Sequence, residues 1–294
     1  MTPTRTAESF ALLEEITATA GLPSAGASPI RLAENDLWRL PGQIVVRIAR
    51  AGQDGASARE VAVARWLLQH RVPAVRPIAM DQPIVVGGRS ATFWEELPPH
   101  KAGRESDLAP LLRQLHELPK PPFAIGEMDP FIRIRYRLIE ARVIAETDRS
   151  WLLGQLDELG EAWSNLPEGR PSCVIHGDAW GGNCAVTAEG AVLLDFERAS
   201  LGRPEWDLTS TAVAVDTFGS LSRESYKRFC DAYGYDVMAW PGYPVLRAIR
   251  ELRLVTFALQ VANDTSETAE QAQYRLACIR GTRGPRPWGW TAVG

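Results

Sequence analysis

The sequence predicts an α+β fold in two lobes, a small antiparallel-sheet lobe over residues 1–97 and a larger, mainly helical lobe over residues 98–294. The first segment contains β-branched runs separated by tight turns, as half-buried strands do. In the second, apolar residues recur at three- and four-residue spacing, the period of amphipathic helices. With 294 residues and 45% hydrophobic content, the chain can bury a substantial core.

The composition limits the class of protein. No run of about eighteen apolar residues occurs, and Met1–Phe10 lacks the basic-then-apolar order of a signal peptide, so we expect a cytoplasmic protein that does not cross a membrane. A net charge of −4 without a basic cluster argues against a nucleic-acid partner and permits an acidic pocket for a cationic substrate. The four cysteines are far apart, which indicates neither a zinc site nor a disulfide framework. The sequence predicts no particular oligomeric state.

Strands and tight turns are predicted in order along the first lobe. Residues 30–40 form a strand with an internal turn, residues 41–43 a turn, and Ile44–Ile48 a β-branched strand that completes a hairpin. Residues 84–94 form a second hairpin, because Gly87-Gly88 suits a turn that requires positive φ. A small antiparallel sheet therefore accounts for much of this lobe.

Two charged residues of the first lobe are predicted to lie close together. Alternation along the third strand buries Val46 and Ile48 and puts Arg47 on the opposite face. The next helix, predicted over residues 58–70, carries Glu60 near its first turn. That carboxylate can pair with the cation, or it can complete a capping box with the serine before the helix. The sequence leaves both roles open.

Helices are predicted along the second lobe, each begun by a capping side chain. The first three cover residues 106–118, 129–146 and 148–165. Apolar residues on one face of the first indicate a core-forming helix. Further helices run to Gly281, and the tail, residues 285–294 with two tryptophans, is expected to pack on the lobe.

One motif carries chemistry. A hydrophobic strand leads into His176–Asn183, and Asp195–Glu197 follows a second apolar run. Short strands on either side of Glu189 are predicted to form a hairpin with a three-residue loop. Asn183 lies six residues before Glu189 and Asp195 six after it, so antiparallel pairing brings both to the open end of the hairpin.

These residue types suit phosphoryl transfer. Such a reaction requires the protein to position a hydroxyl nucleophile and to hold Mg²⁺ against the nucleotide phosphates. Asp178 has the place of the catalytic residue that orients the hydroxyl, and Asn183 and Asp195 have the places of the metal ligands. An isolated Asp-x-x-x-x-Asn is common in loops, so the prediction rests on the whole conjunction of strand, His-Gly-Asp, Asn, hairpin and Asp-Phe-Glu.

With these motifs, the chain resembles the aminoglycoside phosphotransferase and choline kinase-like family, which shares the bilobal protein-kinase-like fold. Glu197 stands where protein kinases have the glycine of Asp-Phe-Gly, and the chain returns to helix after residues 202–208 without an activation segment. The local match covers roughly residues 172–208, with a looser match over residues 30–97. In this fold His176 organises the catalytic loop rather than acting as a base.

The resemblance implies a nucleotide site in the first lobe. Arg47 takes the place of the phosphate-binding lysine, and no lysine precedes Lys101. A guanidinium is a competent phosphate binder. Glu60 is its implied acidic partner, and Glu95 and Leu97 belong to the hinge that bonds the nucleotide base through its backbone.

The resemblance also implies an activity. The expected enzyme is a Mg²⁺-dependent phosphotransferase that passes the γ-phosphoryl group of ATP or GTP to a small-molecule hydroxyl acceptor, with aminoglycosides, amino sugars and related amino alcohols as the leading class. Glu197 can support the metal or the acceptor, and Glu205, Glu251 and Asp264 are candidate acceptor contacts or surface charges. Two other functions stay open, a kinase of a neutral sugar or other metabolite and a nucleotide-binding regulator that has lost catalysis.

Overall fold

The structure is a computed structural model that describes residues 3–263 and 266–293. It divides into two compact units, each built from two chain segments. The first unit combines Met1–Gly126 with His176–Ser200, and the second combines Glu127–Ile175 with Leu201–Gly294. The predicted lobes, residues 1–97 and 98–294, divide the chain differently, and their boundary stays a prediction.

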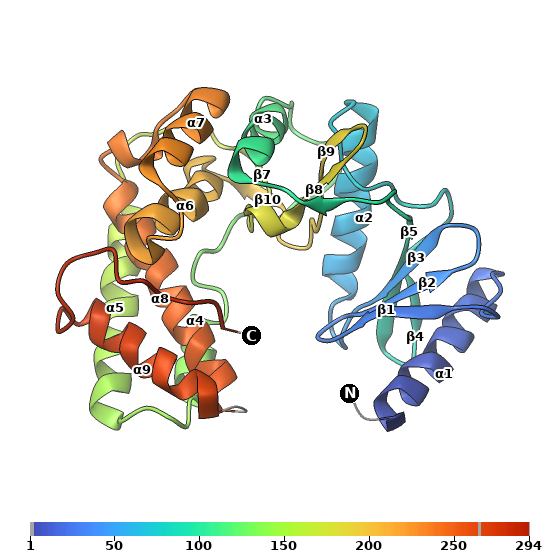
Figure 1. Cartoon of the computed structure of the whole chain (residues 1–294), viewed down its shortest axis with the longest axis horizontal. Helices are drawn as coiled ribbons and strands as arrows, with labels where there is room; N and C mark the ends of the chain where they lie inside the picture. The colour runs from blue at the N-terminus through green and yellow to red at the C-terminus, as the bar shows by residue number, and fades with distance from the viewer. Residues whose placement is uncertain (1–2, 264–265, 294) are drawn as a thin grey trace. The chain divides into compact units, whose positions relative to one another are not determined.

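A five-stranded antiparallel sheet with the strand order β1-β2-β3-β5-β4 belongs to the first unit (Figure 1). Both predicted hairpins are confirmed, since β2 pairs with β3 and β4 pairs with β5. The turn of the second hairpin uses Gly87 and Gly88 at φ +57° and +73°, where a side chain would be strained. The strands are β1 (Ser28–Leu32), β2 (Asp36–Leu40), β3 (Ile44–Ile48), β4 (Ile84–Val86) and β5 (Arg89–Glu95).

The two faces of this sheet have different partners. Helix α1 (Pro3–Ala20), which the sequence did not predict, packs Leu13 and Ile16 into the same buried cluster as Val46 and Ile48 of β3. Because neighbouring residues of a strand point to opposite faces, Arg47 lies on the other side of the sheet, as predicted. On that side lies α2 (Asp54–Gln69).

Helix α2 begins earlier than the predicted residue 58. Its N-cap is Gln53, whose carbonyl oxygen accepts the N–H of Ser57 at 2.9 Å, so Ser57 lies within the helix. The Ser57 hydroxyl lies 2.8 Å from the hydroxyl of Ser90 on β5, which attaches the helix to the sheet. The capping-box role of Glu60 is therefore wrong, because Ser57 does not cap the helix.

The rest of the first unit consists of α3 (Glu105–His116), a three-stranded sheet and a short 3₁₀ turn, η1 (Gly181–Asn183). The sheet has the order β6-β8-β9, from β6 (Lys101–Ala102), β8 (Cys184–Thr187) and β9 (Gly190–Leu193). Helix α3 buries the predicted leucine stripe but starts before Ser106. Its N-cap is Arg104, whose N–H donates to the Asp107 carboxylate at 2.9 Å.

The second unit is mainly helical, and one buried cluster joins four of its helices to the C-terminal tail (Figure 1). Trp288 and Trp290 of the tail are buried, as expected, at 7% and 3% exposure. A two-stranded sheet pairs β10 with β7. The elements are α4 (Ile134–Glu140), α5 (Glu146–Ser164), β7 (Cys173–Ile175), β10 (Ser200–Gly202), α6 (Glu205–Val213), the π-helix η2 (Ala214–Phe218), α7 (Arg223–Tyr233), η3 (Val237–Ala239), α8 (Tyr243–Ala262) and α9 (Ser266–Ile279).

The predicted helix over residues 129–146 is wrong in both bounds. The Asp129 carboxylate accepts the N–H of Phe131 at 2.8 Å, which forms a turn rather than a helix cap. Arg133 then adopts φ +67°, a left-handed conformation that separates this turn from α4. At the other end Ala141 is extended, so α4 stops at Glu140.

The predicted cap of the following helix is also wrong. Helix α5 begins at Glu146 with Ala145 as its N-cap, and Asp148 lies inside the first turn. The Asp148 carboxylate instead accepts a hydrogen bond from the guanidinium of Arg280 just after α9. A side-chain cap does begin a later helix, since Ser222 caps α7 by accepting the N–H of Ser225 at 3.1 Å.

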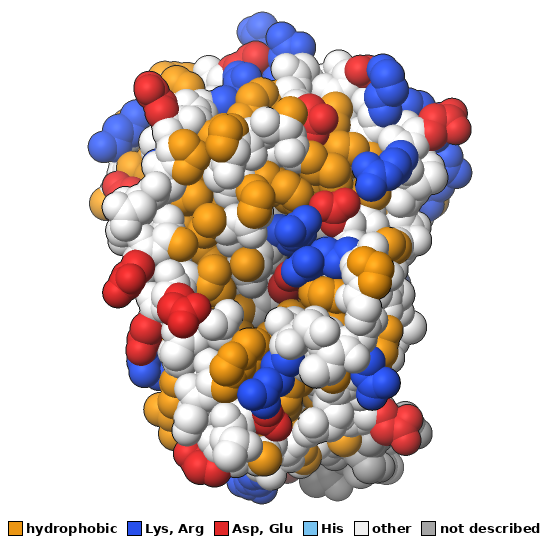
Figure 2. All heavy atoms as spheres, turned by 90° about the vertical axis from the view of Figure 1, so that its left-hand side faces the viewer, with side chains coloured by type: hydrophobic (Ala, Val, Ile, Leu, Met, Phe, Trp, Pro, Cys, Tyr) orange, Lys and Arg blue, Asp and Glu red, His pale blue; other side chains and the backbone are white. Residues whose placement is uncertain are grey.

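Two properties concern the surface and the membrane. On the face shown in Figure 2, Lys and Arg side chains are interspersed with Asp and Glu side chains and with hydrophobic ones. Among the described residues, no helix has the length and apolar character needed to span a bilayer.

Candidate active site

The loop that follows β7 is organised by a buried histidine. His176 is fully buried, and its Nε2–H donates to the carbonyl oxygen of Leu194 at 2.8 Å. Its Nδ1 accepts the N–H of Asp178 at 3.4 Å, and both contacts suit one neutral tautomer. His176 therefore joins the strand end to the segment before Asp195, which supports the structural role implied for it.

Glycine is required at position 177. Gly177 adopts φ +82°, and a Cβ there would lie 2.2 Å from the carbonyl oxygen of Arg198. That atom belongs to the backbone, which cannot move as easily as a side chain. The close approach brings the His-Gly-Asp loop against the segment that follows Asp195.

Asp178 presents its carboxylate at the surface of the first unit. The side chain is 41% exposed, and its Oδ2 lies 3.9 Å from Nε of Arg198. The side-chain amide of Asn183 donates to the backbone carbonyl oxygen of Asp178 at 2.8 Å. This bond uses the amide nitrogen of Asn183 and orients its oxygen away from the loop backbone.

An exposed aromatic residue, Trp180, was not singled out from the sequence. It lies two residues after Asp178 and is 55% exposed. Its ring covers Gly182 so closely that a Cβ there would lie 2.1 Å from the ring. The signal was present, because a tryptophan followed by two glycines in a loop is an exposed aromatic candidate.

Asp195, which follows the β8–β9 hairpin, has an uncommon backbone conformation. Strands β8 and β9 pair Thr187 with Gly190, so the loop has two residues rather than the predicted three. The register shifts by one, and the N–H of Leu194, not of Asp195, donates to the carbonyl oxygen of Asn183 at 3.0 Å. Asp195 itself has φ +58°, which turns its side chain out of the ladder. Asn183 precedes β8 and Asp195 comes after β9, so both still lie next to the open end of the hairpin.

Arg47 is held between two carboxylates. Its Nη1 donates to Glu60 at 2.8 Å, and its Nη2 donates to Glu197 at 2.6 Å. The predicted pair with Glu60 is therefore formed, and the contact with Glu197 was not anticipated. The Arg47 and Glu60 side chains are only 11% and 4% exposed, so both lie in a region of low dielectric.

The pKa of Glu60 shows the effect of burying these charges together. Burial raises the pKa of Glu60 to about 7, and the lowering by Arg47 is opposed by the charges of Asp195 and Glu197. Burial lowers the pKa of Arg47, but the three carboxylates outweigh it and raise that pKa overall. The guanidinium therefore stays charged, and Glu60 binds a proton more readily than an ordinary glutamate.

Arg59 is a further residue that sequence reasoning missed. It precedes Glu60 on α2, and its Nη2 donates to the backbone carbonyl oxygen of Glu197 at 2.8 Å. The segment after Asp195 is thus held by both α2 and β3. A backbone acceptor leaves no signal in the sequence, which explains why Arg59 could not be found there.

Of the predicted hinge residues, Glu95 is the last residue of β5 and Leu97 lies two residues beyond it. The N–H of Glu95 donates to the backbone carbonyl oxygen of Arg76 at 2.8 Å. The N–H of Glu96 donates to the backbone carbonyl oxygen of Gln43 at 2.7 Å. Glu95 is exposed, and Leu97 is half-buried. Their contact with a nucleotide base stays a prediction.

The acceptor candidates belong to the second unit, and two of them are buried. Glu205 is fully buried and accepts the N–H of Arg170 at 2.6 Å. Glu251 is 2% exposed and receives two hydrogen bonds from Arg286, at 2.7 Å and 2.6 Å. The surface-charge alternative is therefore wrong for both, and their contact with an acceptor stays a prediction. Asp264 lies outside the described residues.

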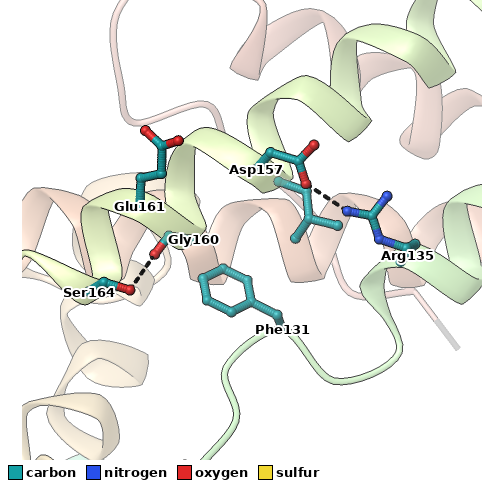
Figure 3. Close-up of a pocket in the computed structure, with 7 residues that line it drawn as sticks. Phe131, Arg135, Asp157, Gly160, Glu161 and Ser164 are labelled. Carbon is teal, nitrogen blue, oxygen red and sulfur yellow. Dashed lines mark hydrogen bonds and ion pairs between the residues drawn. The ribbon is translucent and has the colours of Figure 1, made fainter.

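A separate pocket of about 480 Å³ lies in the second unit against α5 (Figure 3). Asp157 and Arg135 form an ion pair of 2.6 Å at its edge, and Phe131 lies between them and Ser164. None of the predicted site residues lines it. The lining residues are Phe131, Arg135, Leu156, Asp157, Gly160, Glu161 and Ser164.

The donor atoms near Asp195 fit a hard cation. In the described part of the chain, no cluster of three or more His, Cys, Asp and Glu side chains could hold a metal on its own. Asn183 and Asp195 offer one amide oxygen and one carboxylate. Mg²⁺ is commonly bound by one or two such groups, with water and substrate phosphates as the remaining ligands.

A family comparison matches most of the chain. The model of the phosphotransferase enzyme family, APH, matches residues 27–249, and the chain belongs to this family. The match includes Arg47, Asp178, Asn183 and Asp195. The comparison with curated proteins gave no match.

Solved structures confirm the predicted protein-kinase-like α+β fold. A choline/ethanolamine kinase family protein from Mesorhizobium loti is 19% identical, with 95% of this chain and 94% of that chain covered and a TM-score of 0.66. An amicoumacin kinase solved with AMP-PNP, Ca²⁺ and Ami is 15% identical, with 94% and 96% covered and a TM-score of 0.71. An aminoglycoside phosphotransferase from Streptomyces rimosus is 20% identical, with 81% and 97% covered and a TM-score of 0.61.

Proposed function

We propose that this protein is a Mg²⁺-dependent kinase of small molecules, which transfers the γ-phosphoryl group of ATP or GTP to a hydroxyl of an aminoglycoside, an amino sugar or a related amino alcohol. The observation that carries the proposal is the exposed carboxylate of Asp178, on a loop that is hydrogen-bonded to Asn183. Asn183 precedes the β8–β9 hairpin, and Asp195 follows it. Solved relatives with this fold are named as choline, amicoumacin and aminoglycoside kinases.

In the proposed reaction Asp178 orients the acceptor hydroxyl and takes its proton. The hydroxyl oxygen forms a bond to the γ-phosphorus, and the bond from that phosphorus to the bridging oxygen breaks. The electron pair leaves with the nucleoside diphosphate. Mg²⁺, when bound, neutralises charge on the transferred and leaving groups.

The other residues bind and position. Asn183 and Asp195 would hold the metal through oxygen atoms, and Arg47 would contact the nucleotide phosphates. Nε of Arg198 lies 3.9 Å from Oδ2 of Asp178, where it can help to orient the carboxylate toward the acceptor. Glu95 and Leu97 would bond the nucleotide base through the backbone.

The acceptor class is tested with a panel. ADP or GDP release is measured with aminoglycosides, amino sugars and amino alcohols, and with neutral sugars and polyols of similar size. We expect at least one amine to have the highest kcat/KM, and Asp178→Asn to abolish that signal. Faster phosphorylation of a neutral sugar would favour the metabolite kinase, and nucleotide binding without turnover on the whole panel would favour the regulator.

A further inference from the structure

The two ion pairs of Arg47 are unequal. The Glu60 side chain is 4% exposed, and removing one partner of such a buried pair leaves an uncompensated charge. The Glu197 side chain is 25% exposed, so its carboxylate can turn toward water at little cost. Of the two partners, Glu197 is the one that another anion can replace.

The backbone of Glu197 is fixed independently of its side chain. Its carbonyl oxygen accepts a hydrogen bond of 2.8 Å from Nη2 of Arg59 on α2. Its N–H lies 3.4 Å from Oδ1 of Asp195. The carboxylate can therefore leave Arg47 by side-chain rotation alone, while the Asp195 segment keeps its contacts with α2.

We propose that Glu197 is a positioning residue that holds Arg47 in the nucleotide-free protein and yields it to the nucleotide phosphates. The inference rests on the proposed function, because it takes Arg47 as the phosphate-binding cation. Phosphate and carboxylate oxygens accept the same charge-assisted bonds from a guanidinium, so the incoming nucleotide competes with Glu197 for Nη2 of Arg47.

Charge counting gives the sign of the effect. When both carboxylates are ionised, Glu60 and Glu197 together place two negative charges against the single positive charge of Arg47. A polyanionic nucleotide without a metal must approach this excess of negative charge and also displace Glu197. Removing the Glu197 charge relieves both costs, so the metal-free nucleotide should bind more tightly to a variant without this carboxylate.

The test is calorimetric titration of ADP into the full chain in the presence of EDTA. Glu197→Gln should bind metal-free ADP roughly five- to thirtyfold more tightly than the wild type, the range expected when one competing ion pair of about 1–2 kcal/mol is lost. Glu197→Asp keeps the charge on a shorter side chain, and its gain should be smaller. Glu117→Gln, which removes an equal charge from the exposed pair with Arg113 on α3, should match the wild type.

A double-mutant cycle separates release of Arg47 from general repulsion. The gain from Glu197→Gln should become smaller when it is made in an Arg47→Ala background, because only through-space repulsion is then relieved and no guanidinium remains to be released. A gain of the same size in that background is repulsion alone and overturns the proposal, as does unchanged or weaker binding by Glu197→Gln. Melting curves of every variant identify any that fails to fold, in which case Glu197→Asp carries the comparison.

The cycle also tells two failures apart. If Arg47→Ala alone weakens ADP binding while Glu197→Gln has no effect, Arg47 binds phosphate but Glu197 does not hold it. If Arg47→Ala leaves ADP affinity unchanged, the assignment of Arg47 to phosphates fails, and the role of Glu197 fails with it.

Discussion

The side-chain amide of Asn183 donates a hydrogen bond to the backbone carbonyl oxygen of Asp178 at 2.8 Å. One residue thus has two tasks, since its nitrogen fixes the loop that carries Asp178 and its oxygen remains directed elsewhere. Aspartate would serve as a metal ligand equally well, but it has no donor for that carbonyl. Asparagine at position 183 therefore suits the loop as well as the proposed metal site.

Asn183→Asp separates these two tasks. The carboxylate would face the Asp178 carbonyl oxygen and disturb the loop that carries Asp178, so we expect kcat to fall about five- to over a hundredfold, the cost of a lost part-buried hydrogen bond at about 1–3 kcal/mol. Mg²⁺ titrations of nucleotide binding should show metal affinity equal to or above that of the wild type. Loss of metal affinity with unchanged kcat would show that the loop does not depend on the amide.

The catalytic role of Asp178 has its own test. Asp178→Asn keeps the shape of the side chain and removes the acceptor for the hydroxyl proton, so turnover should fall by about a hundredfold or more. Nucleotide affinity should stay within a few fold, because Asp178 is assigned to the acceptor and not to the nucleotide. Both quantities are measured on one preparation, and turnover close to that of the wild type would remove Asp178 from the mechanism.

Asp195 is predicted to carry the metal dependence. Asp195→Ala should abolish the tightening of nucleotide binding by Mg²⁺, because the carboxylate assigned to the metal is lost, whereas Asn183→Ala should weaken the tightening less. Calorimetric titrations of ADP with and without Mg²⁺ measure both. Unchanged metal dependence in Asp195→Ala would place the metal elsewhere.

The sequence was most informative where a feature depends on near neighbours. Alternation along β3 predicted correctly that Arg47 and Val46 have opposite faces, and Gly87-Gly88 predicted a turn that needs positive φ. The metal-ligand candidates Asn183 and Asp195 were brought to one end of a hairpin by the same kind of counting. Alternation and turn chemistry act within a few residues, so a single sequence displays them.

Features decided by tertiary contacts or single dihedral angles could not be predicted in this way. Arg133 adopts a left-handed conformation just before α4. Because the residue is neither glycine nor asparagine, its type did not indicate this conformation. The hairpin register differs by one residue because Gly190 pairs in the ladder rather than sitting in the loop. The bond from Arg59 to the Glu197 carbonyl depends on how α2 packs, which residue types alone do not encode.

Gly177 offers a sharp test of the loop geometry, with Gly88 as its control. Both have positive φ, at +82° and +73°, so alanine at either position pays a backbone cost of about 1–2 kcal/mol. Only at Gly177 would the new Cβ meet a backbone atom, the Arg198 carbonyl oxygen at 2.2 Å. Gly177→Ala should therefore reduce both the free energy of unfolding and turnover more than Gly88→Ala. Equal effects in denaturant titrations and rate assays would refute the close approach.

The raised pKa of Glu60 predicts how stability depends on pH. Between its unfolded value of about 4.3 and its folded value of about 7, the folded protein holds a proton that the unfolded chain releases, so stability falls as the pH rises through this window. Glu60→Gln lacks this titration. The free energy of unfolding of the wild type relative to Glu60→Gln should therefore decline from pH 4 to pH 8, by at most about 1.4 kcal/mol per pH unit.

Urea titrations in metal-free buffer measure that difference, with Glu117→Gln as a control. Glu117 is exposed on the protein surface. The free energy of unfolding of the wild type relative to Glu117→Gln should therefore change little over the same pH range. If the free energy of unfolding of the wild type instead rises relative to that of Glu60→Gln as the pH rises, the effect of the Arg47 ion pair on the pKa of Glu60 is larger than the effect of burial.

Arg47 connects the proposed phosphate contact with the stability of the first unit. Arg47→Ala should lower kcat/KM for the nucleotide by roughly ten- to over a hundredfold, equivalent to one charge-assisted contact of about 1.5–3 kcal/mol. It should also destabilise the protein, because Glu60 is left buried without its cation. Adding Glu60→Gln should recover stability without recovering kcat/KM, which separates folding from phosphate binding.

Arg47→Lys should recover part of the rate, since it restores charge without the fork that reaches both carboxylates. Wild-type kinetics in Arg47→Ala would transfer the phosphate contact to another cation, with Arg39 and Arg50 as the next candidates.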